Sequence, residues 1–379
     1  MPEQAVLEKR ACAQPVIPPE FHFGVYEIIL TWDCNLRCTY CYECQPDKTT
    51  KELRQSHKEP MSPAKIAEIT DFIIHTHDRG ARELQIIFWG GEPFLAFEAI
   101  QEFIARLEAA RQDGRINLPI HYMTTSNLTA ITLEQMQYLQ TKPFTLLVSL
   151  DGTEETTERH RGKGTFAKVI KNMALLYGLR IPFSIRATFS PQEIPALGKD
   201  LNFINNLEQG FWWSFDHTKT PLDKDNLEDA LAVLLAFYKH VPRNYDLTLE
   251  KYLGRKNNTT HCIDPHQVVT VDPEGNLRIC SRVDWVIGNI ADGITQYAEV
   301  KDLPFYSGRP LPACADCLVY ECCKGGCIGA HFEKNKEKTL NYQLNDSFCK
   351  EMFLLQLLKE NLTLQRQYNE LKEFEEAPV

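Results

Sequence analysis

The stretch VYEIILTWDCNLRCTYC, residues 25–41, carries the two signals that decide the fold. Its first eight residues are rich in β-branched and aromatic side chains, which predicts a strand. The strand runs directly into Cys34, Cys38 and Cys41, and the next cysteine is the offset Cys44. Three thiolates can hold a [4Fe–4S] cluster and leave one iron open to a small molecule. A structural zinc loop is the alternative, but it would need a fourth Cys or His ligand.

Strands and helices alternate from there to residue 215. Short apolar runs predict five more strands, at 84–89, 120–125, 144–150, 182–189 and 211–215. Apolar residues at helical spacing predict helices after Ser62-Pro63, at 96–107, and near 132–140, 165–177 and 195–206. Six strands that alternate with helices imply parallel βαβ crossovers, in a sheet that is either open or curled into a partial barrel. The carboxyl ends of such strands are the usual place for chemistry.

The pattern changes after one more amphipathic helix, at 226–241. Residues 262–349 are rich in cysteine, glycine and turn residues, and the runs 268–271 and 277–282 flank a turn, which predicts a hairpin. A last helical pattern covers 351–375. We therefore expect a lead-in (1–24), an α/β domain (25–220), a helical linker (221–260), a cysteine-rich domain (261–350) and a C-terminal helix (351–379).

Composition and charge limit the class of protein. The 379 residues include 41 Lys and Arg against 51 Asp and Glu, and the net charge of −10 argues against broad binding to nucleic acid or an anionic membrane. No apolar run reaches the length of a membrane span, and residues 1–20 lack a signal-peptide pattern. We therefore expect a cytoplasmic protein that binds neither nucleic acid nor membrane.

The 13 cysteines are odd in number, and none lies between residues 45 and 261. A disulfide framework is not expected in a reducing compartment and would leave more than half of the chain unlinked. Clustered metal ligation is therefore the better interpretation. Cys12, Cys44 and Cys322 fall outside the ligand sets described below and are interpreted as bystanders.

The spacing of Cys34, Cys38 and Cys41 resembles the defining motif of the radical S-adenosylmethionine (SAM) superfamily. Three further segments resemble family motifs and follow predicted strands in the family's order, namely GGEP at 90–93, TSN at 125–127 and SLDG at 149–152. The resemblance implies a partial (β/α)6 TIM-like barrel, a [4Fe–4S] cluster on the three cysteines and SAM as cofactor. It assigns SAM contacts to Tyr42, Gly91, Glu92, Asn127, Ser149, Arg161 and Leu222.

By the same resemblance, Glu92 accepts a hydrogen bond from the methionine amino group, Ser149 lies near the ribose, and Arg161 contacts the SAM carboxylate. Tyr42 and Leu222 pack by the adenine. Each motif also has a plain structural interpretation. The two glycines are then only a tight turn, the SLDG segment caps a helix, and Arg161 is one charge of a solvated segment.

The later cysteines resemble the seven-cysteine SPASM extension, which holds auxiliary [4Fe–4S] clusters. The resemblance implies two auxiliary ligand sets, Cys262, Cys280 and Cys327 for the nearer cluster and Cys314, Cys317, Cys323 and Cys349 for the farther one. With the N-terminal cluster this makes three. The nearer set lacks a fourth cysteine, so its iron is open or His261 or another group completes it. A zinc ribbon is the alternative for Cys314 and Cys317.

The resemblance implies reductive cleavage of SAM to a 5′-deoxyadenosyl radical that abstracts hydrogen from a substrate. SPASM enzymes act mostly on peptides and proteins, so we expect a maturase that crosslinks, epimerises or excises backbone from a ribosomally made precursor peptide. Sulfatase maturases have an aspartate that acts as a base directly after the second SPASM cysteine. This chain has Ser281 at that position, which weakens the interpretation as a sulfatase maturase. No residue is assigned to act on the substrate itself.

Three partners follow from this interpretation: the precursor peptide, a ferredoxin or flavodoxin as external electron donor, and a separate small leader-binding protein. The last is expected because only 24 residues precede the first predicted strand. Two alternatives stay open. One is a radical SAM/SPASM dehydrogenase or decarboxylase of a small molecule. The other, from a different class, is a zinc-binding interaction protein without enzymatic activity.

Overall fold

One ten-stranded sheet forms the centre of the protein in the part of the chain that the computed structural model describes, residues 15–41, 61–216, 221–241, 243–253, 264–309, 311–329 and 346–375. Its strand order is β10-β9-β8-β7-β1-β2-β3-β4-β5-β6. Six of its strands, all parallel to their neighbours in this group, are β1 (Val25–Thr31), β2 (Leu84–Gly90), β3 (Ile120–Ser126), β4 (Phe144–Ser149), β5 (Phe183–Phe189) and β6 (Phe211–Phe215). The predicted α/β architecture with six parallel strands is therefore confirmed.

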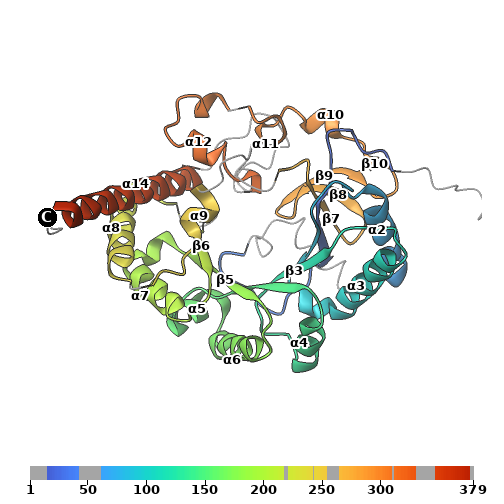
Figure 1. Ribbon diagram of the computed structural model, residues 1–379, viewed down its shortest axis with the longest axis horizontal. Coiled ribbons are helices and arrows are strands. Elements are labelled where there is room, and N and C mark those ends of the chain that lie inside the picture. The colour runs from blue at the N-terminus through green and yellow to red at the C-terminus, as the bar shows by residue number, and fades with distance from the viewer. Residues whose placement is uncertain are drawn as a thin grey trace, which may run out of the picture.

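The sheet curves, and helices cover its convex side, as Figure 1 shows. These helices are α2 (Pro63–Thr76), α3 (Phe97–Gln112), α4 (Leu133–Gln140), α5 (Glu154–Arg161), α6 (Thr165–Gly178), α7 (Ile194–Asn205) and α8 (Lys224–His240). Short 3-10 turns, η2 (Pro93–Ala96) and η3 (Pro191–Glu193), precede α3 and α7. The strands β6 and β10 stay at opposite edges of the sheet, so the barrel is partial and not closed.

Local sequence explains where the helices begin. The Ser62 side chain accepts a hydrogen bond from the Lys65 amide, and proline occupies the first position of α2. At α4, Thr132 and Gln135 form a capping box. The sequence analysis missed α5, whose segment EETTERHR contains no apolar residue and so has no hydrophobic stripe.

Alternate residues of the strands are buried against the helices. Phe88 on β2 lies with its ring centroid 6.0 Å from that of Phe103 on α3, and Phe88, Tyr122 and Phe144 stack along neighbouring strands. The residues between them, such as Trp89, keep partial exposure on the concave side. The concave side therefore offers accessible side chains at the carboxyl ends of the strands.

The cysteine-rich segment continues the same sheet. Strand β7 (Val268–Val271) pairs in parallel with β1, and β8 (Asn276–Cys280), β9 (Val283–Asn289) and β10 (Gly293–Ile294) follow in antiparallel order. The predicted hairpin is confirmed, whereas β9 and β10 were not predicted. The expected boundary near residue 260 lies outside the described residues, and the sheet continues from β1 into β7 without a break.

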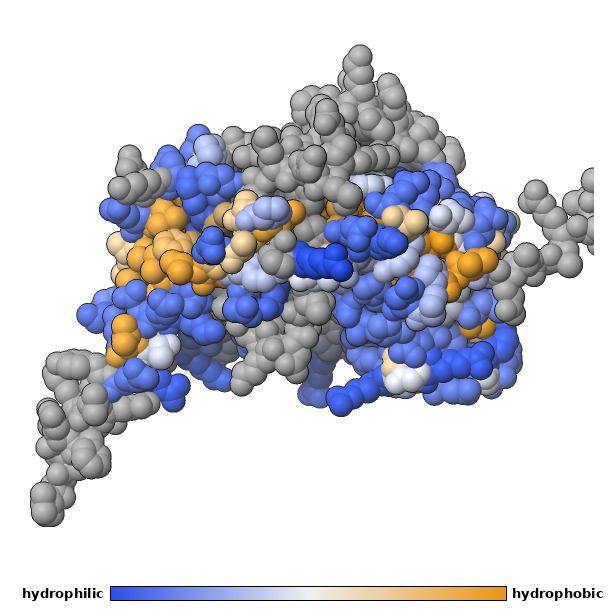
Figure 2. Space-filling model, turned by 90° about the horizontal axis from the view of Figure 1, so that it is seen from above, coloured by the Kyte–Doolittle hydropathy of each residue, from blue (hydrophilic) through white to orange (hydrophobic). Residues whose placement is uncertain are grey.

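Small helices and one long helix complete the chain, namely α9 (Thr248–Leu253), α10 (Tyr297–Val300), α11 (Pro304–Ser307), η4 (Pro312–Cys314), α12 (Tyr320–Cys323) and α14 (Asp346–Glu375). Helix α14 begins five residues earlier than 351, where we expected it, and packs against α8. Figure 2 shows a mostly hydrophilic face with a hydrophobic patch on the side where α14 leaves the body. No helix in the described part of the chain is both long and apolar enough to cross a membrane.

A buried ion pair ties the hairpin to the start of the cysteine loop. The Arg278 guanidinium donates from Nε to Asp272 Oδ2 at 2.8 Å and lies over the Trp32 ring, 5.4 Å from its centroid. Asp272 is fully buried and Arg278 is 6% exposed. Trp32 lies two residues before Cys34, so this pair joins the C-terminal segment to the loop.

The Arg278→Met substitution should lower the free energy of unfolding by about 3–5 kcal/mol, because it leaves the Asp272 charge buried without its partner. Urea denaturation measures the change. Arg115→Met is the matched control, since the Arg115–Asp113 pair is exposed and worth less than about 1 kcal/mol. Adding Asp272→Asn to Arg278→Met should restore part of the loss. Equal, small losses in both single variants would contradict this role of the pair.

Candidate functional site

The three N-terminal cysteines lie in the loop that leaves the carboxyl end of β1. All three are partly exposed. The loop is folded locally: the Cys34 amide donates to Asp33 Oδ1 at 3.0 Å, and the Cys41 amide donates to the Cys38 carbonyl at 3.1 Å. The loop therefore presents its thiols at the same edge of the sheet where β2, β3 and β4 end.

Two glycines let the end of β2 lie against the base of this loop. The Gly91 amide donates to the Thr31 carbonyl at 2.9 Å, and the Glu92 amide donates to the Asp33 carbonyl at 2.8 Å. A Cβ atom on Gly91 would lie 2.3 Å from the Asp33 carbonyl oxygen, and one on Gly90 would lie 2.3 Å from that of Thr31. Close approach of two backbones therefore requires glycine at both positions.

Glu92 connects the ends of β2 and β3. It is 1% exposed, and its carboxylate accepts hydrogen bonds from the Ser126 hydroxyl at 2.8 Å, the Asn127 amide at 2.8 Å and the Phe94 amide at 3.2 Å. Burial raises the pKa of Glu92 to about 7, although these hydrogen bonds oppose the shift. A carboxylate has about four acceptor positions, so one remains for a further donor such as an amino group.

Asn127 carries this connection to the cysteine loop. Its Nδ2 donates to Asn35 Oδ1 at 2.9 Å and lies 3.8 Å from Cys34 Sγ. Its Oδ1 accepts from the backbone amide and the hydroxyl of Thr129. The predicted site residues Glu92, Asn127 and Cys34 thus lie together, although they come from three different strand ends.

The SLDG segment holds the other side of the loop through Asp151, which the sequence analysis did not single out. Asp151 is fully buried and forms a bidentate ion pair with Arg161, at 2.7 and 2.9 Å. Burial alone would raise the pKa of Asp151, but the charge of Arg161 and the hydrogen bonds from His160 and Arg161 hold it well below its usual range. Tyr40, between the second and third cysteines, donates to the same carboxylate at 2.6 Å.

Both structural alternatives for this segment differ from what is observed. Arg161 is 7% exposed and paired, so it is not one charge of a solvated surface. The residue before α5 is Thr153, and its side chain makes no capping hydrogen bond, so neither Ser149 nor Asp151 caps the helix. Gly152 is required where it stands, because a Cβ atom there would lie 2.4 Å from Asp200 Oδ1.

The remaining predicted SAM contacts differ in position. Ser149 ends β4, is partly exposed on the concave side, and pairs in register with Arg186 on β5. Leu222 is fully buried, and its amide donates to Ser347 Oγ on α14 at 3.0 Å. Tyr42 lies outside the described residues.

Four of the later cysteines surround one cavity of about 280 Å³. They come from separate elements: Cys314 from η4, Cys317 from the following turn, Cys323 from α12 and Cys349 from α14. Burial, together with the neighbouring thiols of Cys314 and Cys317, raises the pKa of Cys349 to about 11. Crowded thiols of this kind ionise readily only when a positively charged metal group neutralises them.

The four thiols of this cavity agree with two kinds of metal site. Four cysteine ligands are typical of structural zinc sites and of iron–sulfur clusters alike. Among the described residues, no group of three or more His, Cys, Asp or Glu side chains is placed to hold a metal ion as it stands.

Two of the three cysteines expected for the nearer auxiliary cluster are described. Cys280 ends β8, and burial raises its pKa to about 12, with contributions from the charges of Glu27 and Cys327. Cys280 and Cys327 are thus neighbours. Cys262 and His261 lie outside the described residues, as do Cys12 and Cys44, and Cys322 lies within α12 beside Cys323.

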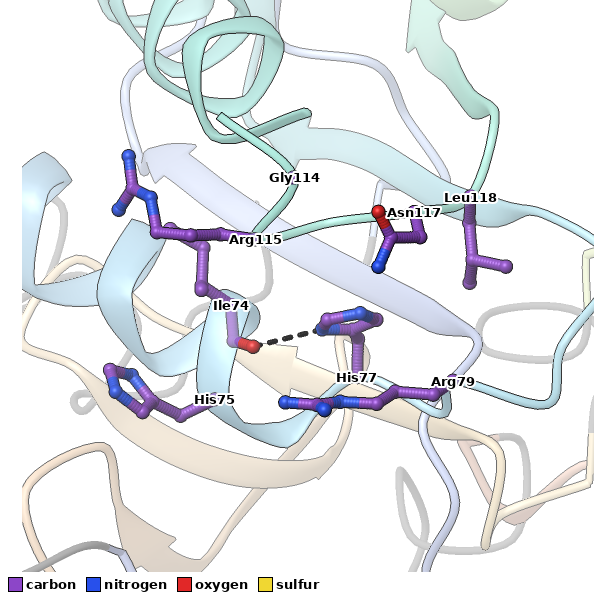
Figure 3. Close-up of a pocket in the computed structure, with 8 residues that line it drawn as sticks. All are labelled: Ile74, His75, His77, Arg79, Gly114, Arg115, Asn117 and Leu118. Atoms are coloured by element: carbon purple, nitrogen blue, oxygen red, sulfur yellow. Dashed lines mark hydrogen bonds between the residues drawn. The ribbon is translucent and has the colours of Figure 1, made fainter. Parts of the chain in front are cut away.

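Another cavity, of about 360 Å³, lies at the opposite edge of the sheet, where α2 and α3 end (Figure 3). His77 points to the Ile74 carbonyl at 2.9 Å, and His75 Nδ1 lies 2.6 Å from the Asp71 carbonyl. Basic side chains at helix carboxyl ends satisfy free carbonyls and the helix dipole. This cavity has no cysteine in its lining and is not the candidate site.

The fold and the site at the carboxyl ends of the strands define a class of protein. In this class, a partial parallel barrel carries a cysteine loop at the carboxyl edge of its sheet. Residues 28–197 match the family model described as the Radical SAM superfamily. This domain belongs to that superfamily, which confirms the resemblance drawn from the sequence. Membership implies SAM and a [4Fe–4S] cluster as cofactors of the domain.

Known proteins resemble the chain in sequence and fold. It is 25% identical over 160 residues to the cysteine-type anaerobic sulfatase-maturating enzyme of Clostridium novyi, a match that covers 40% of each protein. The native anSMEcpe structure with bound AdoMet and Cp18Cys peptide gives a TM-score of 0.69 at 18% identity, over 91% of this chain and 99% of that one. Streptococcus suis SuiB bound to precursor peptide SuiA gives 0.55 at 15% identity, over 86% and 76%.

These matches establish different things. The chain spans about two fifths of the curated relative in the sequence match. The structural likenesses extend over most of the chain and establish the fold, including the cysteine-rich segment.

The buried Glu92 predicts a pH dependence of stability. Its pKa is about 7 in the folded protein against a usual 4.5, so the folded state holds the proton more tightly than the unfolded chain. The free energy of unfolding should therefore fall as pH rises from about 4.5 to 7, by an amount on the order of 3 kcal/mol.

Urea denaturation at several pH values measures this fall. Glu92→Gln should be less stable than the wild type at low pH, because it loses acceptor positions, and should lose less stability as pH rises. Glu134→Gln, on the exposed face of α4, controls for the removal of one carboxyl group. Parallel curves for the wild type and Glu92→Gln would contradict the shifted pKa.

Proposed function

We propose that this protein is a radical SAM enzyme that modifies a ribosomally synthesised precursor peptide. The main support is the cysteine loop at the carboxyl edge of the radical SAM domain, held on one side by Asn127 and on the other by Asp151. When bound, SAM and the [4Fe–4S] cluster supply a carbon-centred radical that takes hydrogen from an unactivated C–H bond.

The positions of the predicted residues support their proposed roles. Cys34, Cys38 and Cys41 would hold the cluster. Glu92, with one acceptor position left, would receive the SAM amino group, and Ser149 on the concave side would face the ribose. Glu92 and Asn127 also keep their own strand ends in place before any ligand binds.

We propose three [4Fe–4S] clusters in total. The four-thiol cavity supports one auxiliary cluster. The neighbouring thiols of Cys280 and Cys327 support the second, to which Cys262 would contribute. We also propose a cytoplasmic location, a compartment in which thiols stay reduced and available as metal ligands.

A peptide substrate is supported by the two solved structures described above, both of which contain a bound peptide. A fold alone does not fix a substrate, so the change made to the peptide, whether crosslink, epimerisation or excision, is left to measurement. We also propose a separate leader-binding protein and an external electron donor such as ferredoxin or flavodoxin.

A sulfatase-maturase-like activity is the second candidate. Besides the sequence match to such an enzyme, one contact favours it: the Ser281 side chain hydrogen-bonds to the Glu27 carboxylate on β1. A carboxylate therefore lies beside position 281 even though serine occupies it. Glu27 also accepts from the Thr270 hydroxyl at 2.7 Å.

Cluster content provides the first test. Anaerobically reconstituted protein should contain about twelve irons, in three clusters of four, and should release 5′-deoxyadenosine from SAM when dithionite is added. Replacing Cys34, Cys38 and Cys41 by alanine should remove about four irons and abolish this release. Replacing Cys314, Cys317 and Cys323 should remove a similar amount of iron and leave the release measurable.

Colourless, zinc-loaded protein would instead support the interaction-protein alternative. Substrate class needs a second measurement, mass spectrometry of a co-expressed candidate peptide. Loss of two hydrogens indicates a crosslink, and a larger loss indicates excision. An unchanged sulfatase peptide together with a modified precursor peptide would exclude the second candidate.

A further inference from the structure

The segment between Cys38 and Cys41 is held by one buried carboxylate. The Tyr40 hydroxyl donates to Asp151 Oδ2 at 2.6 Å, across 111 residues of sequence. Thr39, the other residue between these cysteines, donates its amide to the His160 carbonyl at 2.9 Å. Both residues of the segment are thus bonded to the region from the end of β4 to the end of α5.

Asp151 is itself fixed from three directions. Arg161 donates to both of its oxygens, and the Thr188 amide on β5 donates to Oδ1 at 3.0 Å. His160 Nδ1 lies 3.5 Å from Oδ2. A carboxylate with this many partners has a single position, so it can determine the position of the tyrosine that it binds.

The Tyr40 ring is restrained as well as its hydroxyl. The His160 ring packs against it edge to face, with centroids 5.3 Å apart. The Arg161 guanidinium lies 5.5 Å from the centroid of the Tyr40 ring, within the range of a cation–π contact. His160 Nε2 is in turn 2.6 Å from Glu193 Oε2, which anchors this group to η3.

We propose that Asp151 is a positioning residue that fixes the Cys38–Cys41 segment through Tyr40, with Arg161 as its charge partner. This role rests on the proposed function, because the segment matters only where its thiols hold a cluster. It differs from the role that the family resemblance gives Arg161. The two bonds to Asp151 use two of the five guanidinium N–H donors, so Arg161 keeps others for a SAM carboxylate.

Three variants separate the two roles. Tyr40→Phe removes only the hydroxyl that Asp151 binds, and Asp151→Asn keeps Arg161 but removes the charge. Tyr26→Phe is the matched control, since Tyr26 is a buried tyrosine of β1 whose hydroxyl bonds to Thr76 Oγ1 at 2.8 Å, away from the cysteine loop. Tyr40→Phe and Tyr26→Phe each lose one tyrosine hydroxyl, so a general loss of stability affects these two alike, whereas Asp151→Asn also removes the counter-charge of the buried Arg161.

The first measurement uses metal-free protein and iodoacetamide, with labelling of each cysteine followed by mass spectrometry. The thiols of Cys38 and Cys41 should react several-fold faster in Tyr40→Phe and Asp151→Asn than in the wild type. Cys317, which is exposed, serves as the internal reference. Tyr26→Phe should label as the wild type does.

The second measurement uses reconstituted protein. Tyr40→Phe and Asp151→Asn should change the electron paramagnetic resonance line shape of the reduced N-terminal cluster. They should also slow 5′-deoxyadenosine release at least fivefold, with the KM for SAM within about twofold of the wild type.

Labelling and line shape equal to the wild type in Tyr40→Phe would overturn the proposal. It would also be overturned if Asp151→Asn raised the KM for SAM while labelling stayed unchanged, because Asp151 would then only orient Arg161. If the wild-type protein assembles no iron–sulfur cluster, the proposed function is refuted instead. The labelling experiment is independent of that result because it uses metal-free protein.

Discussion

The site depends on one close contact, that between the backbone at the end of β2 and the base of the cysteine loop. Gly91 has no side chain, so the Glu92 amide can reach the Asp33 carbonyl. The Glu92 carboxylate then lies where it can bind Ser126 and Asn127 at the end of β3. Asn127 in turn reaches Asn35 and Cys34. Each contact requires the one before it, so the loop is positioned by the sheet.

Two buried carboxylates, one on each side of the loop, have pKa values that are shifted in opposite directions. Glu92 accepts hydrogen bonds only from neutral groups, and burial raises its pKa. Asp151 pairs with Arg161 and His160, and its pKa is lowered although it is equally buried. The first therefore keeps the capacity to change its protonation state near neutral pH, whereas the second is a permanent charge. A residue that meets an incoming ligand suits the first environment, and one that fixes the chain suits the second.

The sequence was sufficient for features that depend on local pattern. Alternating apolar runs and helix caps predicted the six parallel strands and most of their helices, and motif spacing placed the cysteine loop and Glu92 at strand ends. It was not sufficient for α5, which lacks an apolar stripe, or for the Tyr40–Asp151 bond and the Ser281–Glu27 contact. These depend on which distant segments meet, and no local period encodes that. The buried position of Leu222 against α14 was not predicted for the same reason.

Helix α14 links the outermost cysteine site to the edge of the barrel. It supplies Cys349 to the four-thiol cavity. Two other residues of α14 hold the chain at the end of β6 and just beyond it: Glu351 accepts a hydrogen bond from the Phe215 amide at 2.9 Å, and Ser347 accepts one from the Leu222 amide. Glu351 is 2% exposed, so this attachment is buried. Because a metal group binds its ligands only in the folded arrangement, its binding free energy adds to folding free energy. Metal bound at the cavity would thus stabilise α14 and, through it, the end of the sheet at β6.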